Sequence, residues 1–252
     1  VAPAKHRKTF LAENIALSIA FGSDFAGFKV PDEKKVLYFM AEGGYFPNRN
    51  RIQDMCSKYN QNLVMGYPSY LPINRTEEYE YLIEMIKAEK PDVLILDPLK
   101  RFHDVDENSA SQMGEIFGRI RNIIDEFKIS AIIVHHTGKV SSKGGRGSSV
   151  IMGEYDSCIE MTKYKDGNAL LKFDMRHVET PPTRTIKFNG ETLWFENQSG
   201  IVELIESAGG KILKKDLINL FSQSNASAYR QIDKAVKSGL IEKNDNHLVL
   251  IE

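Results

Sequence analysis

Residues 91–99 read P-D-V-L-I-L-D-P-L, and this stretch decides the fold class that we expect. Four apolar residues in a row, bounded by an acid and a helix-breaking proline, are typical of a short strand buried on both faces. Residues 34–42 and 129–136 repeat the pattern, because each is an apolar run that ends in polar side chains. Helical periodicity separates these runs. The sequence therefore predicts an α/β fold with a mostly parallel central sheet.

The predicted strands end in side chains that can do chemistry: Glu42, Asp97 and the pair His135-His136. Because parallel strands end at the same edge of a sheet, and ligands bind there, we expect these groups to converge. We expect the connecting helices over residues 49–59, 77–90 and 111–127.

A phosphate-binding loop is suggested by residues 2–9, A-P-A-K-H-R-K-T, which lead into an apolar helical stretch. In such loops a Lys neutralises phosphate charge and a Ser or Thr hydroxyl binds Mg²⁺, roles that Lys8 and Thr9 fit. Ala2 and Arg7 stand where such a loop carries glycines. Arg7 is the larger departure, because glycine there lets the backbone approach the phosphates. Taken alone, a positively charged helix start explains the Lys8-Thr9 pair equally well.

The two strand-end acids each have a functional and a plain interpretation. Glu42 can orient and deprotonate a water that attacks a γ-phosphate, or it is a solvated strand end before two glycines. Asp97 can hold Mg²⁺ at the sheet edge, or it is a turn residue before Pro98.

The segment after the third predicted strand carries further candidates. One histidine of the 135–136 pair can sense a γ-phosphate, and the other is expected to pack against the sheet. Residues 144–149, G-G-R-G-S-S, form a glycine-rich loop around Arg146. This loop contacts nucleic acid, places Arg146 on a neighbouring subunit's nucleotide, or is a solvated surface loop.

The last third of the chain has a different pattern. Short strands with hairpin turn signals begin near residue 156, and residues 197–200 read as a linker. Three helical stretches and an N-D-N turn between apolar segments then resemble a winged helix. We therefore expect two domains, residues 1–198 and 199–252.

The candidate DNA contacts of the tail are Tyr229, Arg230, Lys234 and Lys237. A protein-binding or autoregulatory module is the competing interpretation, because acids dilute the charge.

Bulk properties limit the remaining possibilities. The net charge of -1 over 252 residues excludes the general attraction to nucleic acid of strongly basic proteins, although not a local basic patch. Cys56 and Cys158 form neither a disulfide framework nor a metal motif, and no apolar run reaches membrane-spanning length. We expect a cytoplasmic protein without a membrane partner. Val1 reads like the end of a strand, so we also expect part of the native N-terminus to be missing from this numbering.

The order of these motifs resembles a known family. K-T-F-L-A-E-N-I-A-L-S-I-A, Y-F-M-A-E, L-D-P-L-K-R-F-H-D-V-D-E-N-S, V-H-H-T-G-K and R-G-S-S-V together resemble the RecA-like P-loop ATPases of the plasmid RepA type. These AAA-type ATPases are hexameric replicative DNA helicases with relatives in phages and mobile elements. The resemblance runs from Ala2 to about Arg176.

The resemblance implies roles for individual residues. ATP would be bound by the loop residues Pro3, Ala4, Lys5, His6, Arg7, Lys8, Thr9 and Phe10. Thr9 and Asp97 would hold Mg²⁺, and Glu42 would be the catalytic base. His136 would sense phosphate, Arg146 would act on the adjacent subunit, and Arg176 is the transferable part of a later Lys-x-Arg pair.

Together with the strand-end residues, the resemblance implies an oligomeric, ATP- and Mg²⁺-dependent DNA motor, a hexameric helicase that encircles single-stranded DNA and whose tail contacts duplex DNA. Two alternatives stay open at this point. The chain could be a nucleotide-independent DNA-binding or scaffold protein with a degenerate phosphate loop. It could also be a RecA-like ATPase that acts in recombination or strand annealing.

Overall fold

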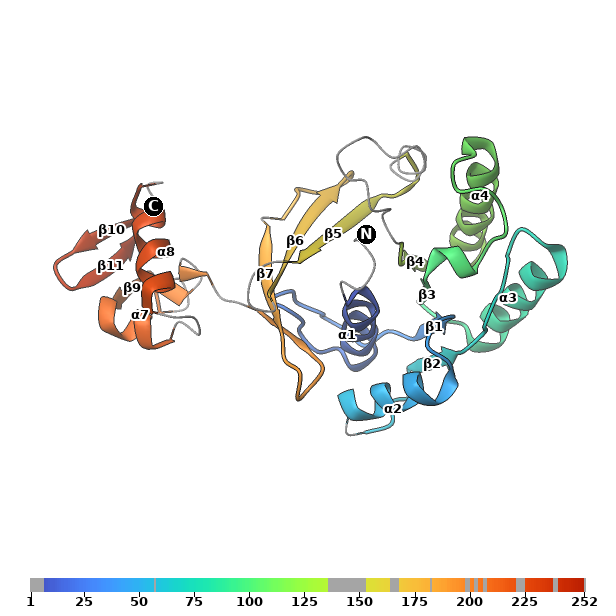
Figure 1. Ribbon diagram of the computed structural model, residues 1–252, viewed down its shortest axis with the longest axis horizontal. Helices are drawn as coiled ribbons and strands as arrows, with labels where there is room; N and C mark the ends of the chain where they lie inside the picture. Colours follow the sequence, from blue (N-terminus) through green and yellow to red (C-terminus); the bar gives the residue numbers. More distant parts are fainter. Residues whose placement is uncertain are drawn as a thin grey trace. The chain divides into compact units, whose positions relative to one another are not determined.

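The protein's structure is a computed structural model that describes residues 7–56, 58–135, 153–163, 168–181, 183–197, 200–201, 204–205, 208–220, 225–237 and 240–251 (Figure 1). The chain divides into two compact units, residues 1–196 and 197–252. Among the helices of these described stretches, none combines the length and the apolar character that crossing a bilayer requires.

The first unit contains the following elements in chain order: α1 (Lys8–Phe21), β1 (Val36–Met40), α2 (Tyr45–Met55), β2 (Leu63–Gly66), α3 (Thr76–Glu89), β3 (Val93–Asp97), the short 3-10 helix η1 (Leu99–Arg101), α4 (Ala110–Phe127), β4 (Ser130–Ile133), β5 (Ser157–Lys163), β6 (Asn168–Met175), β7 (Arg184–Phe188) and β8 (Phe195–Asn197). The second unit contains β9 (Lys211–Leu213), α7 (Lys214–Leu220), α8 (Asn225–Lys237), β10 (Ile241–Asn244) and β11 (His247–Leu250).

A parallel sheet with the strand order β2-β1-β3-β4 lies at the centre of the first unit. All five residues of β1 and all five of β3 are buried, which explains why both read as unbroken apolar runs. Val36 pairs with Val93 and Met40 with Asp97, so the two strands end together. The predicted α/β fold with a parallel sheet is confirmed.

Alternate residues of β1 and β3 supply two different cores. Leu37, Phe39, Leu94 and Leu96 face α3 and α4, which lie together on one side of the sheet (Figure 1). The intervening side chains, such as Tyr38 and Ile95, face α1. There α1 presents alanines at helical spacing: Ala12, Ala16 and Ala20. Because alanine is small, the helix axis can lie close to the strands.

The opposite side of α1 covers a second sheet with the order β5-β6-β7-β8 (Figure 1). Leu11 packs there with Met161 and Ile186. Asn14 is fully buried on this side and binds two backbone groups at the start of β8. Its Nδ2 donates to the Leu193 carbonyl at 3.2 Å, and its Oδ1 accepts from the Phe195 N–H at 2.6 Å.

The second unit has its own core, in which Ile205, Leu217, Ile232, Ile241 and Leu248 are buried. Its strands form an antiparallel sheet with the order β10-β11-β9, packed with α7 and α8. The turn between β10 and β11 occupies the predicted N-D-N position. Assignment of this unit as a winged-helix domain, and of the first as an ATPase domain, stays a prediction.

The structure departs from the expected elements at four places. β2 and β9 were not predicted, because both are short and β2 is only half-buried along its length. α2 begins at Tyr45 instead of residue 49, with Pro47 in its first turn, where proline is compatible with a helix. β8 begins at Phe195, after a turn that occupies part of the predicted strand 192–195.

Replacing Asn14 by Ala should destabilise the first unit, because two buried backbone groups would lose their partner at once. We expect the free energy of unfolding to fall by about 2–3 kcal/mol. Chemical denaturation of the variant measures this. Asn122→Ala on the exposed surface of α4 is the matched control and should change stability by less than about 0.5 kcal/mol. Equal effects of the two substitutions would contradict the role given to Asn14.

Candidate nucleotide-binding site

The candidate site begins at the amino end of α1, where the predicted phosphate loop enters the helix. Arg7 precedes the helix with a left-handed backbone, φ 58° and ψ 31°, which glycine adopts without strain. Its guanidinium lies over the Phe188 ring, 4.3 Å from the ring centre. The chain therefore keeps at position 7 the backbone geometry typical of glycine, and a cation–π contact offsets part of the strain.

Asp97 lies at the carboxyl end of β3 and is 1% exposed. Its Oδ2 accepts a hydrogen bond from the Tyr38 hydroxyl at 2.7 Å. Burial raises the pKa of Asp97, whereas hydrogen bonds from Tyr38 and Thr9 lower it. The hydroxyl of Thr9 is thus near enough to the carboxylate of Asp97 to lower its pKa. Both are oxygen ligands of the kind that Mg²⁺ prefers.

Lys8 lies in the same region and is buried. Burial lowers the pKa of its amino group to about 8, while the charges of Asp97 and Glu42 act to raise it. Lys8 is therefore mostly protonated at neutral pH. A bound phosphate would stabilise the charged form further, because an opposite charge nearby raises the pKa of a lysine.

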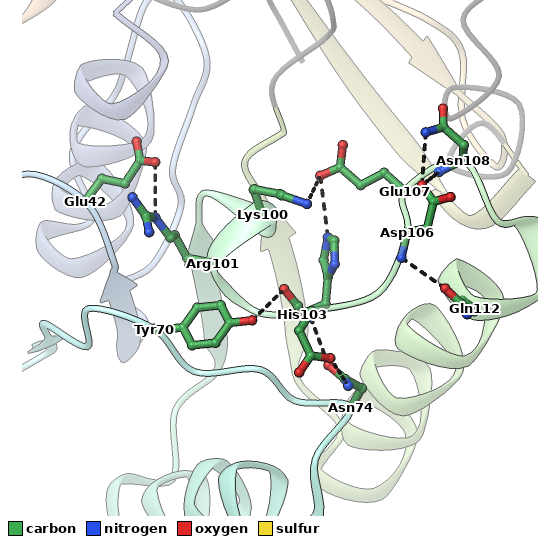
Figure 2. Close-up of polar contacts among 11 residues, drawn as sticks. Glu42, Tyr70, Asn74, Lys100, Arg101, His103, Asp106, Glu107, Asn108 and Gln112 are labelled. Carbon is green, nitrogen blue, oxygen red and sulfur yellow. Dashed lines mark hydrogen bonds and ion pairs between the residues drawn. The ribbon is translucent and has the colours of Figure 1, made fainter.

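Glu42 follows β1 in a turn with a fixed backbone. Gly43 and Gly44 have φ values of 87° and 77°, and the Glu42 carbonyl accepts from Asn48 Nδ2 at 2.6 Å. A Cβ at Gly43 would come within 2.7 Å of the Asn48 side chain, so this turn requires glycine. The Glu42 side chain is half-exposed and faces Arg101, whose Nε donates to Oε1 at 3.4 Å (Figure 2).

A buried ion pair beside the site was not predicted from the sequence. Glu13 of α1 is fully buried, and Arg51 of α2 donates to its Oε1 from Nε at 2.6 Å. The same guanidinium lies over the Phe10 ring and donates to Asn48 Oδ1 at 3.0 Å. Asn48 in turn holds the Glu42 carbonyl. The pair therefore links α1 to the turn that carries Glu42. A charged side chain within the apolar stretch 10–20 is the only sequence signal for it.

Burial raises the pKa of Glu13 from its ordinary 4.5 to about 7, although the hydrogen bond and charge of Arg51 oppose the shift. The charge of Asp97 adds to the upward shift. Glu13 Oε2 has no hydrogen-bonding partner, so half of this carboxylate is buried without compensation. The ionised form of Glu13 is therefore costly in the folded protein.

The other predicted site residues have different positions. His135 lines a cavity of about 530 Å³ together with Lys8 and Cys158. Arg176 follows β6, and its Nη2 donates to the Gly153 carbonyl at 2.8 Å. The loop and sensor residues that lie outside the described residues are Ala2, Pro3, Ala4, Lys5, His6, His136 and Arg146.

The predicted DNA contacts of the tail share one side of α8. Ala228, Ile232 and Ala235 of this helix are buried in the second unit's core. The candidate residues are exposed: Tyr229, Arg230, Lys234 and Lys237. Lys214 lies over the Tyr229 ring, 4.9 Å from its centre, and adds a further cation. Asp233 lies between these residues in the sequence, and Lys243 balances its negative charge, with Nζ 2.9 Å from Asp233 Oδ1.

Comparison with known proteins identifies the family. Residues 1–142 match the AAA domain family, so the chain belongs to that family. The structure is similar to a solved ATPase domain, with a TM-score of 0.60 and 13% sequence identity over 79% of this chain and 83% of that one. It is also similar to a DnaB-like replicative helicase described with its interactions with primase, at the same TM-score and identity.

The second of these matches spans 79% of this chain and 56% of the helicase, so the chain corresponds to about half of that protein. At 13% identity the likeness shows the fold alone, which the chain shares with that ATPase domain and with that DnaB-like replicative helicase. The predicted fold of the first unit is confirmed to this level.

The buried Glu13 gives a prediction about pH. The folded protein binds the Glu13 proton more tightly than the unfolded chain does. The stabilisation that folding gains from binding the Glu13 proton is therefore fully present below about pH 4.5. It is lost as the pH rises through about 7. Glu13→Gln removes this titration. We expect the variant to gain stability relative to wild type between pH 5 and 8, by on the order of 3 kcal/mol.

Denaturant unfolding at pH 5, 6, 7 and 8 measures the difference. Glu80→Gln, at an exposed position on α3, is the control for the same exchange of side chains and should not give this gain. A difference between wild type and Glu13→Gln that stays constant over this range would contradict the raised pKa.

Proposed function

We propose that the protein is an ATP-dependent DNA motor, a RepA-like replicative helicase that hydrolyses ATP. The observation that carries this proposal is the convergence of Lys8, Thr9 and Asp97 at one edge of the sheet, with Glu42 at the neighbouring strand end. Membership of the AAA domain family and the fold shared with the two solved structures support it.

The residues present fit an ATP–Mg²⁺ complex. Lys8 and the N–H groups at the start of α1 would bind the phosphates, and Phe10 lies in the first turn of this helix. The Thr9 hydroxyl and the Asp97 carboxylate lie near each other and offer oxygen ligands that would hold Mg²⁺. When bound, Mg²⁺ neutralises charge that develops on the phosphates.

Glu42 is the residue that we assign to proton transfer. Its carboxylate would accept a proton from the water that attacks the γ-phosphorus, while the bond to the bridging oxygen breaks and ADP leaves. The Gly43–Gly44 turn and Asn48 fix its backbone, and half-exposure leaves its carboxylate accessible to water.

The oligomer is part of the proposal. The RepA-type helicases that the sequence resembles are hexameric rings, in which one subunit completes its neighbour's site. We assign Arg146 to that role, His136 to phosphate sensing and Arg176 to a supporting contact. The exposed side of α8, with Arg230, Lys234 and Lys237, would contact duplex DNA.

ATP hydrolysis with and without single-stranded DNA tests the function. Lys8→Ala and Glu42→Gln should each lower the DNA-stimulated kcat at least about 100-fold, because they remove phosphate binding or proton transfer. The controls, Lys87→Ala and Glu80→Gln on α3, should leave the rate unchanged. If wild type hydrolyses no ATP and binds no nucleotide, the motor hypothesis is wrong and the hypothesis of a DNA-binding scaffold is favoured instead.

A strand-displacement assay separates DNA unwinding from strand annealing.

Arg7 gives a second test of the same site. Arg7→Gly keeps the left-handed backbone and removes the Cβ, so an additional backbone N–H can approach phosphate. One such hydrogen bond, about 1.5 kcal/mol, corresponds to about a tenfold lower KM for ATP. Arg7→Ala, which keeps a Cβ and loses the cation, should give no gain. A higher KM in Arg7→Gly would show instead that the guanidinium itself binds phosphate.

A further inference from the structure

We infer that Glu13 is a positioning residue for ATP hydrolysis, because a series of three contacts connects its carboxylate to the backbone of Glu42. Arg51 of α2 contacts both Glu13 and Asn48. Asn48 in turn donates to the Glu42 carbonyl. The inference rests on the proposed function, since it concerns the placement of the residue that we assign to proton transfer.

The first contact fixes the guanidinium of Arg51. Its Nε and Nη2 lie 2.6 Å and 2.5 Å from the same oxygen, Glu13 Oε1. The Glu13 side chain is fully buried and that of Arg51 is 22% exposed, so solvent screens the pair little. The guanidinium also lies over the Phe10 ring, 4.8 Å from the ring centre. The carboxylate and the ring therefore restrict the guanidinium from two sides.

The second contact orients the Asn48 amide. Asn48 is 1% exposed, and its Oδ1 accepts from Arg51 Nη2 at 3.0 Å. Because an amide carries an acceptor on one arm and donors on the other, this contact turns Nδ2 toward the Glu42 carbonyl, which it reaches at 2.6 Å. A rotated amide would instead place its oxygen against the carbonyl oxygen. Arg51 therefore decides which arm of Asn48 faces Glu42.

The third contact holds the backbone that carries Glu42. On one side of this residue, the Ala41 N–H donates to the Asp97 carbonyl at 2.8 Å. On the other side, two glycines follow, and glycine is the residue with the greatest backbone freedom. The hydrogen bond from Asn48 to the Glu42 carbonyl limits this freedom. It therefore limits where the Glu42 carboxylate can reach.

Glu13 also shares a helix with the groups that would hold the phosphates. Lys8 and Thr9 lie about one turn before it on α1. A connection from Glu13 to the backbone of Glu42 therefore fixes the proposed base relative to the phosphate ligands. Because a small displacement of a catalytic group costs a large factor in rate, such a connection has a catalytic use.

The Glu13–Arg51 pair is a poor source of stability, which argues against a purely structural role. Glu13 Oε2 is buried and has no hydrogen-bonding partner among the residues that the structure describes. Burying an ion pair gives little net stability, since the loss of hydration offsets the attraction between the charges. Proteins keep groups that cost stability where activity requires them.

Steady-state ATP hydrolysis at pH 8, where Glu13 is mostly ionised, tests the inference in the presence of single-stranded DNA. Glu13→Gln keeps the size of the side chain but offers Arg51 a neutral acceptor, so we expect kcat to fall about tenfold. Asn48→Asp keeps an acceptor for Arg51 and loses the donor to Glu42, so we expect kcat to fall about 100-fold. Both variants should keep the wild-type KM for ATP, because the phosphate ligands are unchanged.

Three further measurements separate positioning from a structural role. The double variant Glu13→Gln with Asn48→Asp should be no slower than Asn48→Asp alone, because both substitutions break the same series of contacts. Denaturant unfolding should show that Glu13→Gln is at least as stable as wild type, so that unfolding does not explain its lower kcat. Ser18→Ala, which removes a buried hydroxyl that has no hydrogen-bonding partner on the same helix, is the control and should keep the wild-type rate.

The outcomes are distinct. If wild type is active and Glu13→Gln keeps its kcat, or if the two effects multiply in the double variant, Glu13 does not position Glu42 and the inference is wrong. If wild type hydrolyses no ATP, the proposed function fails, and hydrogen exchange of the backbone N–H groups of residues 42–48 tests the connection instead. Faster exchange in Glu13→Gln than in wild type supports the connection, and equal exchange contradicts it.

Discussion

The pairing of β1 with β3 is the constraint on which the rest of the structure depends. Their register brings Met40 opposite Asp97, and the Ala41 N–H donates to the Asp97 carbonyl at 2.8 Å. One hydrogen bond beyond the end of β1 thus fixes where the chain turns toward Glu42. Both strands are buried on both faces, so a register shift would move apolar side chains into the wrong core.

The same pairing explains why polar groups are buried beside the sheet edge. Tyr38 lies on the same face of β1 as Met40 and reaches Asp97 by its hydroxyl. α1 covers that face closely through its alanines and brings Lys8, Thr9 and Glu13 to the same side. Burying these groups is costly in free energy, as the raised pKa of Glu13 and the lowered pKa of Lys8 indicate. A protein that binds a charged ligand at this edge has a physical reason to keep them.

The parts of this structure that follow local rules could be predicted from the sequence. Unbroken apolar runs identified β1, β3 and β4, and strand-end acids identified the functional edge, because both depend only on neighbouring residues. The Glu13–Arg51 and Tyr38–Asp97 contacts join residues that are 38 and 59 positions apart, so no local pattern reveals them. The left-handed backbone of Arg7 could not be predicted either, because the sequence showed only that position 7 lacks the expected glycine. β2 was not predicted, because the hydrophobic pattern of a half-buried strand of four residues is too short to identify a strand.

The proposed motor function depends first on nucleotide binding. Calorimetric titration with a non-hydrolysable ATP analogue and Mg²⁺ measures this binding directly. We predict saturable binding of one analogue per chain, abolished by Lys8→Ala and weakened when Mg²⁺ is withheld, because Lys8, Thr9 and Asp97 converge at one edge. Wild-type protein that is folded and yields no saturable binding would contradict the account.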